Sequence, residues 1–159
     1  MGPRRWSPGD PAILMAPLYL VDGFNLLHAV VLRGRERKGW WQVEQQARVV
    51  RLAQGFRGGE VWVVFDARGS ERITGTGMGG AFTPGPHGQR VEVRFAPSAD
   101  DYIVELCAEL QGQRQVIVVS ADRALVDRAR HRGAARLSPW QFAEHCGPTA
   151  AGDEGSNET

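Results

Sequence analysis

Three aspartates stand at or just after the ends of apolar runs in this sequence. Asp22 follows the run 18–21, Asp66 follows 61–65, and Asp122 lies shortly after 116–119. The carboxyl ends of strands in an open parallel sheet emerge on one edge, where ligands bind. The sequence therefore predicts that these three carboxylates, which are far apart along the chain, meet at one edge of a sheet.

A fourth carboxylate is expected from the segment 99–110, whose apolar residues recur at helical spacing. A helix turns by about 100° per residue, so Asp100 lies beside the apolar stripe that includes Ile103. On the same geometry Asp101 and Glu105 face water. We therefore expect Asp100 to join the other three aspartates.

Four clustered carboxylates repel one another and raise one another's pKa values. Lys38 is the only lysine in the chain, so a divalent cation with oxygen ligands, Mg²⁺ or Mn²⁺, is the expected counter-charge. Such a site orients water for in-line attack on phosphorus and stabilises charge on the phosphoryl oxygens. Any one aspartate after a strand is just as often a helix N-cap or turn residue, but four together favour a metal site.

Two polar side chains near these aspartates have two interpretations each. Asn25 lies three residues beyond Asp22, past a sharp turn that Gly23 would permit. Its amide either orients an aspartate or a phosphate oxygen, or caps a helix over 26–31. The Ser120 hydroxyl either holds a carboxylate or a water, or forms a simple helix cap.

Strands and helices alternate through the middle of the chain, with several strands apolar on both faces. This pattern predicts an α/β domain with three layers, in which helices cover both faces of a mostly parallel sheet. The expected strands are 18–21, 61–65, 90–95, 116–119 and 135–137. The expected helices are 43–54, 99–110, one that includes Leu125 and ends at Gly133, and a last helix that begins with the Ser138-Pro139 cap signature.

The length of 159 residues, 42% hydrophobic and 23% charged, fits one globular domain. We expect a flexible arm at 1–16, the domain at 17–146 and a disordered tail at 147–159. No apolar run is long enough to span a bilayer, so a cytoplasmic protein is expected. Two cysteines, Cys107 and Cys146, are too few for a disulfide framework and are expected to be buried thiols.

Basic residues close to the acidic blocks are candidates for binding phosphate groups of a substrate. Those of the segment 33–41 are followed closely by Trp40 and Trp41, a combination suited to unpaired RNA or to an ordinary solvated loop. The candidates are Arg33, Arg35, Arg37, Lys38, Arg68, Arg72 and Arg123. The long stretch 68–89 is interpreted as a connection of no fixed shape or as a substrate flap, and its glycine motif at 75–80 lacks the strand and helix of a dinucleotide site.

Four blocks in order resemble the YacP-like NYN ribonucleases, a branch of the PIN-like superfamily. They are Val21-Asp22-Gly23-Phe24-Asn25, Val63-Val64-Phe65-Asp66-Ala67, Ser98-Ala99-Asp100-Asp101-Tyr102-Ile103 and Val118-Val119-Ser120-Ala121-Asp122-Arg123, within about 19–142. The resemblance implies a PIN-like sheet, acidic ligands at Asp22, Asp66, Asp100 and Asp122 for Mg²⁺ or Mn²⁺, and support from Asn25. Val104 stands where the family often has Glu, so an auxiliary acid is either missing or supplied by Asp101 or Glu105, and Ala121 stands where the family often has Ser.

The function expected from this resemblance is a metal-dependent endoribonuclease that cleaves single-stranded RNA, which could include mRNA on the ribosome. The alternative is an RNA- or ribosome-associated binding module with weak or no catalysis. Another α/β phosphohydrolase is a third hypothesis, although Phe24 stands where the haloacid-dehalogenase type has a second aspartate and Lys38 is the only lysine available. The sequence leaves a monomer and a homodimer equally open.

Overall fold

The computed structural model describes residues 17–32, 43–67, 81–82 and 91–146. Four sequence predictions fall outside these ranges: the arm 1–16, the tail 147–159, the basic segment with Trp40 and Trp41, and the glycine motif at 75–80. Of the expected phosphate-binding cations, only Arg123 lies among the described residues. Within them no helix has the length and apolar character needed to cross a membrane.

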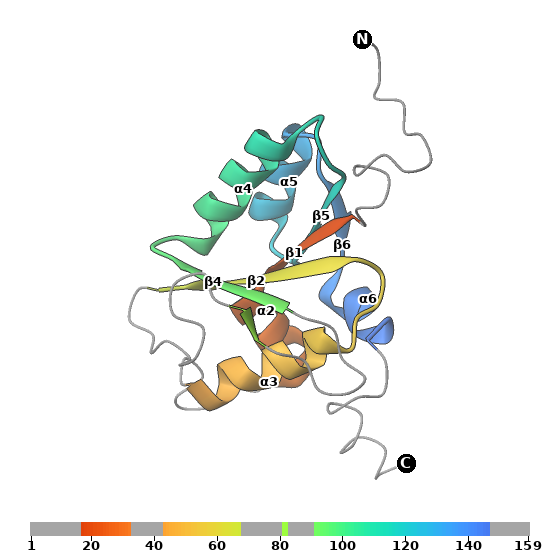
Figure 1. Cartoon of the computed structure of the whole chain (residues 1–159). Coiled ribbons are helices and arrows are strands. Elements are labelled where there is room, and N and C mark those ends of the chain that lie inside the picture. The colour runs from red at the N-terminus through yellow and green to blue at the C-terminus, as the bar shows by residue number, and fades with distance from the viewer. Residues whose placement is uncertain (1–16, 33–42, 68–80, 83–90, 147–159) are drawn as a thin grey trace.

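A six-stranded sheet forms the middle layer, in the order β3-β4-β2-β1-β5-β6 (Figure 1). Five strands run parallel, and β3 is antiparallel to its neighbour β4. The strands are β1 (Leu18–Asp22), β2 (Glu60–Asp66), β3 (Ala81–Phe82), β4 (Val91–Ala96), β5 (Val116–Val119) and β6 (Ala135–Leu137). The predicted three-layer α/β architecture with a mostly parallel sheet is confirmed.

Helices cover both faces of this sheet, with α4 and α5 on one side and α2, α3 and α6 on the other (Figure 1). The helix α2 (Gly23–Leu26) continues directly into η1 (Leu27–Val31), a π-helix. The remaining helices are α3 (Val43–Gln54), α4 (Ala99–Leu110), α5 (Arg123–His131) and α6 (Pro139–Glu144). The ends of α3 and α4 are those expected from the sequence.

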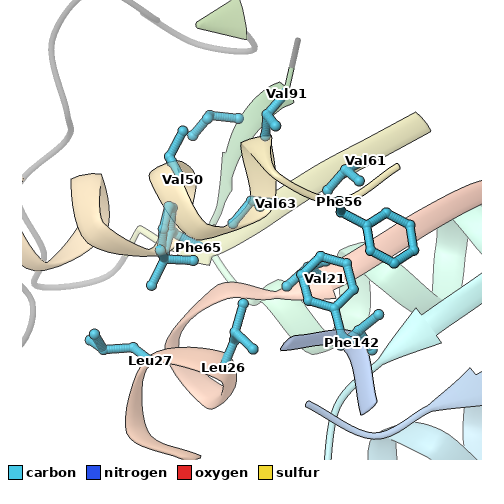
Figure 2. Close-up of a cluster of buried hydrophobic side chains, with 14 of the residues drawn as sticks. Val21, Leu26, Leu27, Val50, Phe56, Val61, Val63, Phe65, Val91 and Phe142 are labelled. Carbon is cyan, nitrogen blue, oxygen red and sulfur yellow. The ribbon is translucent and has the colours of Figure 1, made fainter. Parts of the chain in front are cut away.

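The hydrophobic core on the α3 side is built around aromatic side chains (Figure 2). The rings of Phe56 and Phe142 stack with centroids 4.5 Å apart, and Phe65 contacts both Phe24 and Phe95. Phe142 belongs to α6, whereas Phe56 follows α3, so the stack ties the last helix to the front half of the chain. An isolated bridge between Phe56 and Cys146 lies beside it.

The opposite core packs α4 and α5 against the sheet through Ile103, Leu125 and the strand residues Val64 and Val118. Cys107 is buried in this cluster, and burial raises the pKa of its thiol to about 11. Burial likewise raises the pKa of Cys146 to about 12, although that side chain is half-buried. The prediction of buried thiols therefore holds fully for Cys107 and in part for Cys146.

Hydrogen bonds at the helix ends explain where two helices begin. Ser98 caps α4 by accepting the N–H of Asp101 at 3.2 Å. Ser138 and Gln141 form a reciprocal capping box at the start of α6, with Pro139 as its first residue, as the sequence signature predicts. The helix α5 is followed by Gly133, whose φ of +91° is a conformation that glycine adopts readily.

One local prediction was wrong, and one of two open interpretations is excluded. Residues 81–82 of the stretch expected to lack structure form a strand, since their backbone pairs with β4. The helix expected to begin after Asn25 begins instead at Gly23, so Asn25 is not its cap. On α3 the fully buried residues are Gln46, Val49, Val50 and Ala53, and Val43 and Ala47 pack partly buried against the same core.

Candidate active site

The predicted aspartates lie at the carboxyl edge of the sheet. Asp22 is the last residue of β1 and Asp66 the last residue of β2, which is the neighbouring strand. Asp122 follows β5, the neighbour of β1 on its other side. Asp100 enters from the first turn of α4, after β4. The strand β1 therefore places Asp22 between the carboxyl ends of its two neighbours, β2 and β5.

Asp22 is the most buried of these acids, with 9% of its surface exposed. The pKa of its carboxyl is raised from 3.8 to about 7, first by burial and then by repulsion from Asp100 and from Asp122. A hydrogen bond from Ser120 opposes this increase. An acid with a pKa this high is held in surroundings that favour either a bound proton or a nearby cation.

Two hydrogen bonds join the loop after β5 to the end of β1 and to α2. Ser120 Oγ donates to Oδ2 of Asp22 at 3.3 Å and itself accepts the N–H of Asp122 at 3.0 Å. Asn25 Oδ1 accepts the N–H of Ala121 at 2.9 Å. For Ser120 the structure shows the hydroxyl holding a carboxylate, and for Asn25 it shows an amide that orients the loop between Ser120 and Asp122.

Asp100 is half-buried, as the helical geometry predicts, while Asp101 is exposed. The pKa of Asp100 is raised, first by burial and then by Asp122; Arg128 lowers it, and Asp101 and Asp66 raise it further. Asp66 and Asp122 therefore both act on Asp100, and Asp100 and Asp122 both act on Asp22. These interactions place the four predicted acids in one electrostatic neighbourhood.

Asp122 also caps a helix, which was the competing interpretation of such an aspartate. Its Oδ1 accepts the backbone N–H groups of Ala124 and Leu125 at 3.0 and 3.3 Å, at the start of α5. This capping fixes the side chain beside Asp22 and Asp100. Asp22 occupies the corresponding position before α2, where the backbone N–H of Asn25 in that helix lowers the pKa of its carboxyl, although no hydrogen bond as close as those of Asp122 is formed.

The two expected auxiliary acids lie on the outer side of α4. Asp101 forms an ion pair with Arg128 of α5 at 3.0 Å. The Asp101 side chain is 60% exposed and the Arg128 side chain 49% exposed. Glu105 is exposed, and Val104, at the position where the family often has Glu, is buried at 7%. Arg123, the expected phosphate-binding cation, is exposed at the start of α5, next to Asp122.

Two features of the site were missed by sequence reasoning. Arg128 acts on Asp100, but only the packing of α4 against α5 reveals this, because the two residues are on different helices. Gly23 was expected to permit a sharp turn, yet its φ is not positive. A Cβ at Gly23 would lie 2.5 Å from Cε1 of Phe65, so glycine is needed there for close approach of α2 to β2.

The donors at this edge suit a hard cation, because they are carboxylate, hydroxyl and amide oxygens. In the positions that the side chains take here, however, no three His, Cys, Asp or Glu residues of the described ranges lie close enough to hold one ion together. The four acids share one edge and influence one another's ionisation without converging on a single point.

Comparison with known proteins relates this arrangement to a family. A search of curated proteins found no match. Among solved structures, Rae1 (YacP) from Bacillus subtilis is similar with a TM-score of 0.59 and 23% identity, over 81% of this chain and 72% of that one. Its W164L mutant gives a TM-score of 0.57 and 23% identity, over 82% and 74%. Both likenesses support the fold.

The family model for the YacP-like NYN domain matches residues 19–154, which is most of the chain. The match includes every strand of the sheet except the first residue of β1, and it includes all four aspartates. The family is a nuclease-like one related to RNA. On this evidence the chain belongs to the YacP-like NYN domain family.

Proposed function

We propose that this protein is a metal-dependent endoribonuclease that hydrolyses phosphodiester bonds of single-stranded RNA. The observation that carries the proposal is the buried carboxylate of Asp22, which lies at the carboxyl edge of the sheet under the influence of Asp100 and Asp122. A buried acid repelled by two others is stable in its charged form only with a cation nearby. Membership of a nuclease-like family also supports this proposal.

The residues fit Mg²⁺ or Mn²⁺ in donor type and charge. Mg²⁺ is commonly held by one or two carboxylates and keeps several waters, so three convergent acids are not required. Asp22 and Asp100 would hold the ion, with Asp122 and Asp66 close by. When bound, the metal would lower the pKa of a coordinated water and neutralise charge on the phosphate.

The other side chains would keep these acids in place. The Ser120 hydroxyl donates a hydrogen bond to Oδ2 of Asp22 and so holds that carboxylate in one orientation. Asn25 holds the backbone of Ala121, which sets the position of Asp122 relative to Asp22. Arg128 favours the charged form of Asp100 and so partly offsets burial and Asp122, which raise the pKa of that carboxyl overall.

Substrate binding would involve Arg123, which is exposed beside Asp122. A guanidinium in that place can form bidentate hydrogen bonds with a phosphate of the strand being cut. The predicted cations Arg33, Arg35, Arg37, Lys38, Arg68 and Arg72 remain proposals for the same role. We propose single-stranded RNA as the substrate, since unpaired bases and a flexible backbone can enter an edge of a sheet.

The test is cleavage of a labelled single-stranded RNA with Mn²⁺, with Mg²⁺ and with EDTA. Asp22→Asn and Asp122→Asn should each lower the rate by at least about 100-fold, the scale of losing one electrostatic group in an active site. Asn is also a good N-cap, so Asp122→Asn should keep α5 intact. The matched control is Asp127→Asn, an exposed aspartate on α5 that should cut at the wild-type rate.

Metal-dependent cleavage that neither substitution affects would overturn the assigned roles. A protein that binds RNA in EDTA in a salt-sensitive way, keeps that binding in Asp66→Asn and never cleaves would instead be the RNA- or ribosome-associated binding module.

A further inference from the structure

Among the residues that the structure describes, Trp140 is the one large hydrophobic side chain that is exposed, at 53%. It is the second residue of α6, between Pro139 and Gln141. Most apolar side chains of α6 point inward, and Phe142 is completely buried. The proposed mechanism does not use Trp140, so its exposure needs its own explanation.

Trp140 follows the end of β6 at the same edge of the sheet that carries the aspartates. The strand β6 runs parallel to β5 with Leu137 opposite Val119, and the N–H of Ser120 donates to the carbonyl of Leu137 at 3.3 Å. Ser120 is the residue whose hydroxyl donates to Asp22. Neighbouring strands are about 4.8 Å apart, so the end of β6 lies roughly 10 Å from the end of β1.

The direction of α6 keeps the indole near this edge. The helix starts at the carboxyl end of β6, and Cys146 beyond its last turn bridges to Phe56, which precedes β2. The helix α6 therefore runs back toward the edge of the sheet where the parallel strands begin. Side chains of a helix lean toward its N-terminus, so a residue in the first turn leans toward the carboxyl edge.

The backbone that carries Trp140 is held firmly. The Ser138 and Gln141 capping box closes the first turn of α6, Pro139 is buried, and Phe142 stacks on Phe56. A tryptophan on a fixed backbone has few torsions left to order when it binds a ligand. Two exposed cations belong to neighbouring elements: Arg136 on β6, four residues before Trp140, and Arg123 at the start of α5, which follows β5.

We propose that Trp140 stacks on an unpaired base of the RNA strand whose backbone passes the aspartates. The proposal rests on the proposed function, because it adds a base-binding position to that substrate site. An indole face suits any base of a single strand, and Arg123 and Arg136 can contact phosphates on either side of it. One exposed side chain offers too little apolar area for a stable protein interface, so a base fits it better than a protein partner.

The experiment measures equilibrium binding of a short single-stranded RNA in EDTA, where no cutting interferes. Trp140→Ala should weaken binding by roughly 5- to 100-fold, the effect of losing one base stack, and Trp140→Phe should restore most of it whereas Trp140→Leu should not. Glu144→Ala, an exposed change on the same helix, is the matched control and should bind like the wild type. Equal thermal midpoints for all variants show that α6 is unchanged.

A set of RNAs, each with one abasic position, locates the stacked base. One abasic position should weaken binding to the wild type and have no effect on Trp140→Ala. Equal binding by Trp140→Ala and wild type, or a defect that leucine restores as well as phenylalanine, would overturn the stacking proposal. Loss of self-association in Trp140→Ala without any loss of RNA binding would overturn it too, in favour of a protein contact.

The nuclease proposal is judged separately, by cleavage of the same RNA with Mn²⁺. Binding with the expected Trp140 pattern but without cleavage would remove the nuclease activity and leave the base-stacking site. Cleavage in which Trp140→Ala has the wild-type KM and kcat would leave the nuclease and remove the stacking site. An increase in KM with little change in kcat is the result expected if both are right.

Discussion

The side chain of Asn25 accepts the backbone N–H of Ala121 at 2.9 Å, which joins α2 to the loop after β5, 96 residues further along the chain. Asn25→Ala removes this acceptor while leaving the buried core untouched. Because groups that orient metal ligands change activity by about 10- to 100-fold, we expect a loss of that size in kcat/KM for RNA cleavage. The free energy of unfolding should fall by only about 1 kcal/mol.

Asn25→Asp is the companion variant, since it keeps an acceptor for Ala121 and adds a negative charge. If the hydrogen bond is what matters, Asn25→Asp should retain more activity than Asn25→Ala. The reverse order would show that the added charge beside Asp22 outweighs the loop contact.

The stability of the protein should depend on pH through Asp22. Burial raises the pKa of this carboxyl from 3.8 to about 7, so the native state binds the proton more tightly than the unfolded state. Its ionisation therefore destabilises the fold as pH rises from about 4 to 7, with the full cost above pH 7. Asp22→Asn should then be more stable than wild type at pH 8.5, by at most about 4 kcal/mol.

Urea unfolding in EDTA at several pH values checks this expectation. The gap between Asp22→Asn and wild type should shrink steadily as the pH is lowered toward 4. Asp127→Asn, the same change at an exposed position on α5, is measured beside it as the control. A gap for Asp22→Asn that does not change with pH would mean that Asp22 is not held in the surroundings described.

Added Mn²⁺ should stabilise the wild-type protein against heat. A ligand at 100 times its Kd adds about 2.7 kcal/mol to the free energy of unfolding, so a rise in Tm of several degrees is expected at pH 8. The rise should be lost in Asp22→Asn and should diminish below pH 7, where a proton competes for the same carboxyl. A thermal scan with and without Mn²⁺ measures this, and an unchanged rise in Asp22→Asn would place the ion elsewhere.

Gly23→Ala should destabilise the fold by about 1 to 3 kcal/mol, the usual cost of overpacking. The added Cβ would lie 2.5 Å from the ring of Phe65, which is buried between Phe24 and Phe95. Chemical denaturation measures the loss. The double variant with Phe65→Leu makes room for the methyl group, so the two substitutions should cost less together than the sum of their separate effects.

Sequence patterns predicted the elements that have strong periodicity and clear ends. The helix with Ile103 and the strand with Val118 were found because their apolar residues face a core on one or both sides. The orientation of Asp100 toward the site followed from the same helical geometry. These predictions depended on neighbours along the chain, which a sequence displays directly.

Contacts between distant segments could not be predicted in the same way. The hydrogen bond from Ser120 to Asp22 and the influence of Arg128 on Asp100 depend on which strand and helix lie side by side. The strand at 81–82 was missed because two residues are too few to show alternation, and only pairing with β4 defines it. The need for glycine at position 23 is likewise set by the Phe65 ring of another strand.

The stack of Phe142 on Phe56 also affects the order in which the chain can acquire its structure. The sheet strands that surround Asp22 precede residue 120, but one wall of the aromatic core comes from α6, the last helix described. During synthesis the stack between Phe56 and Phe142 therefore cannot form until residue 142 has been added. Completion of that core is then a late event in biogenesis, and premature termination before α6 would leave an aggregation-prone apolar surface.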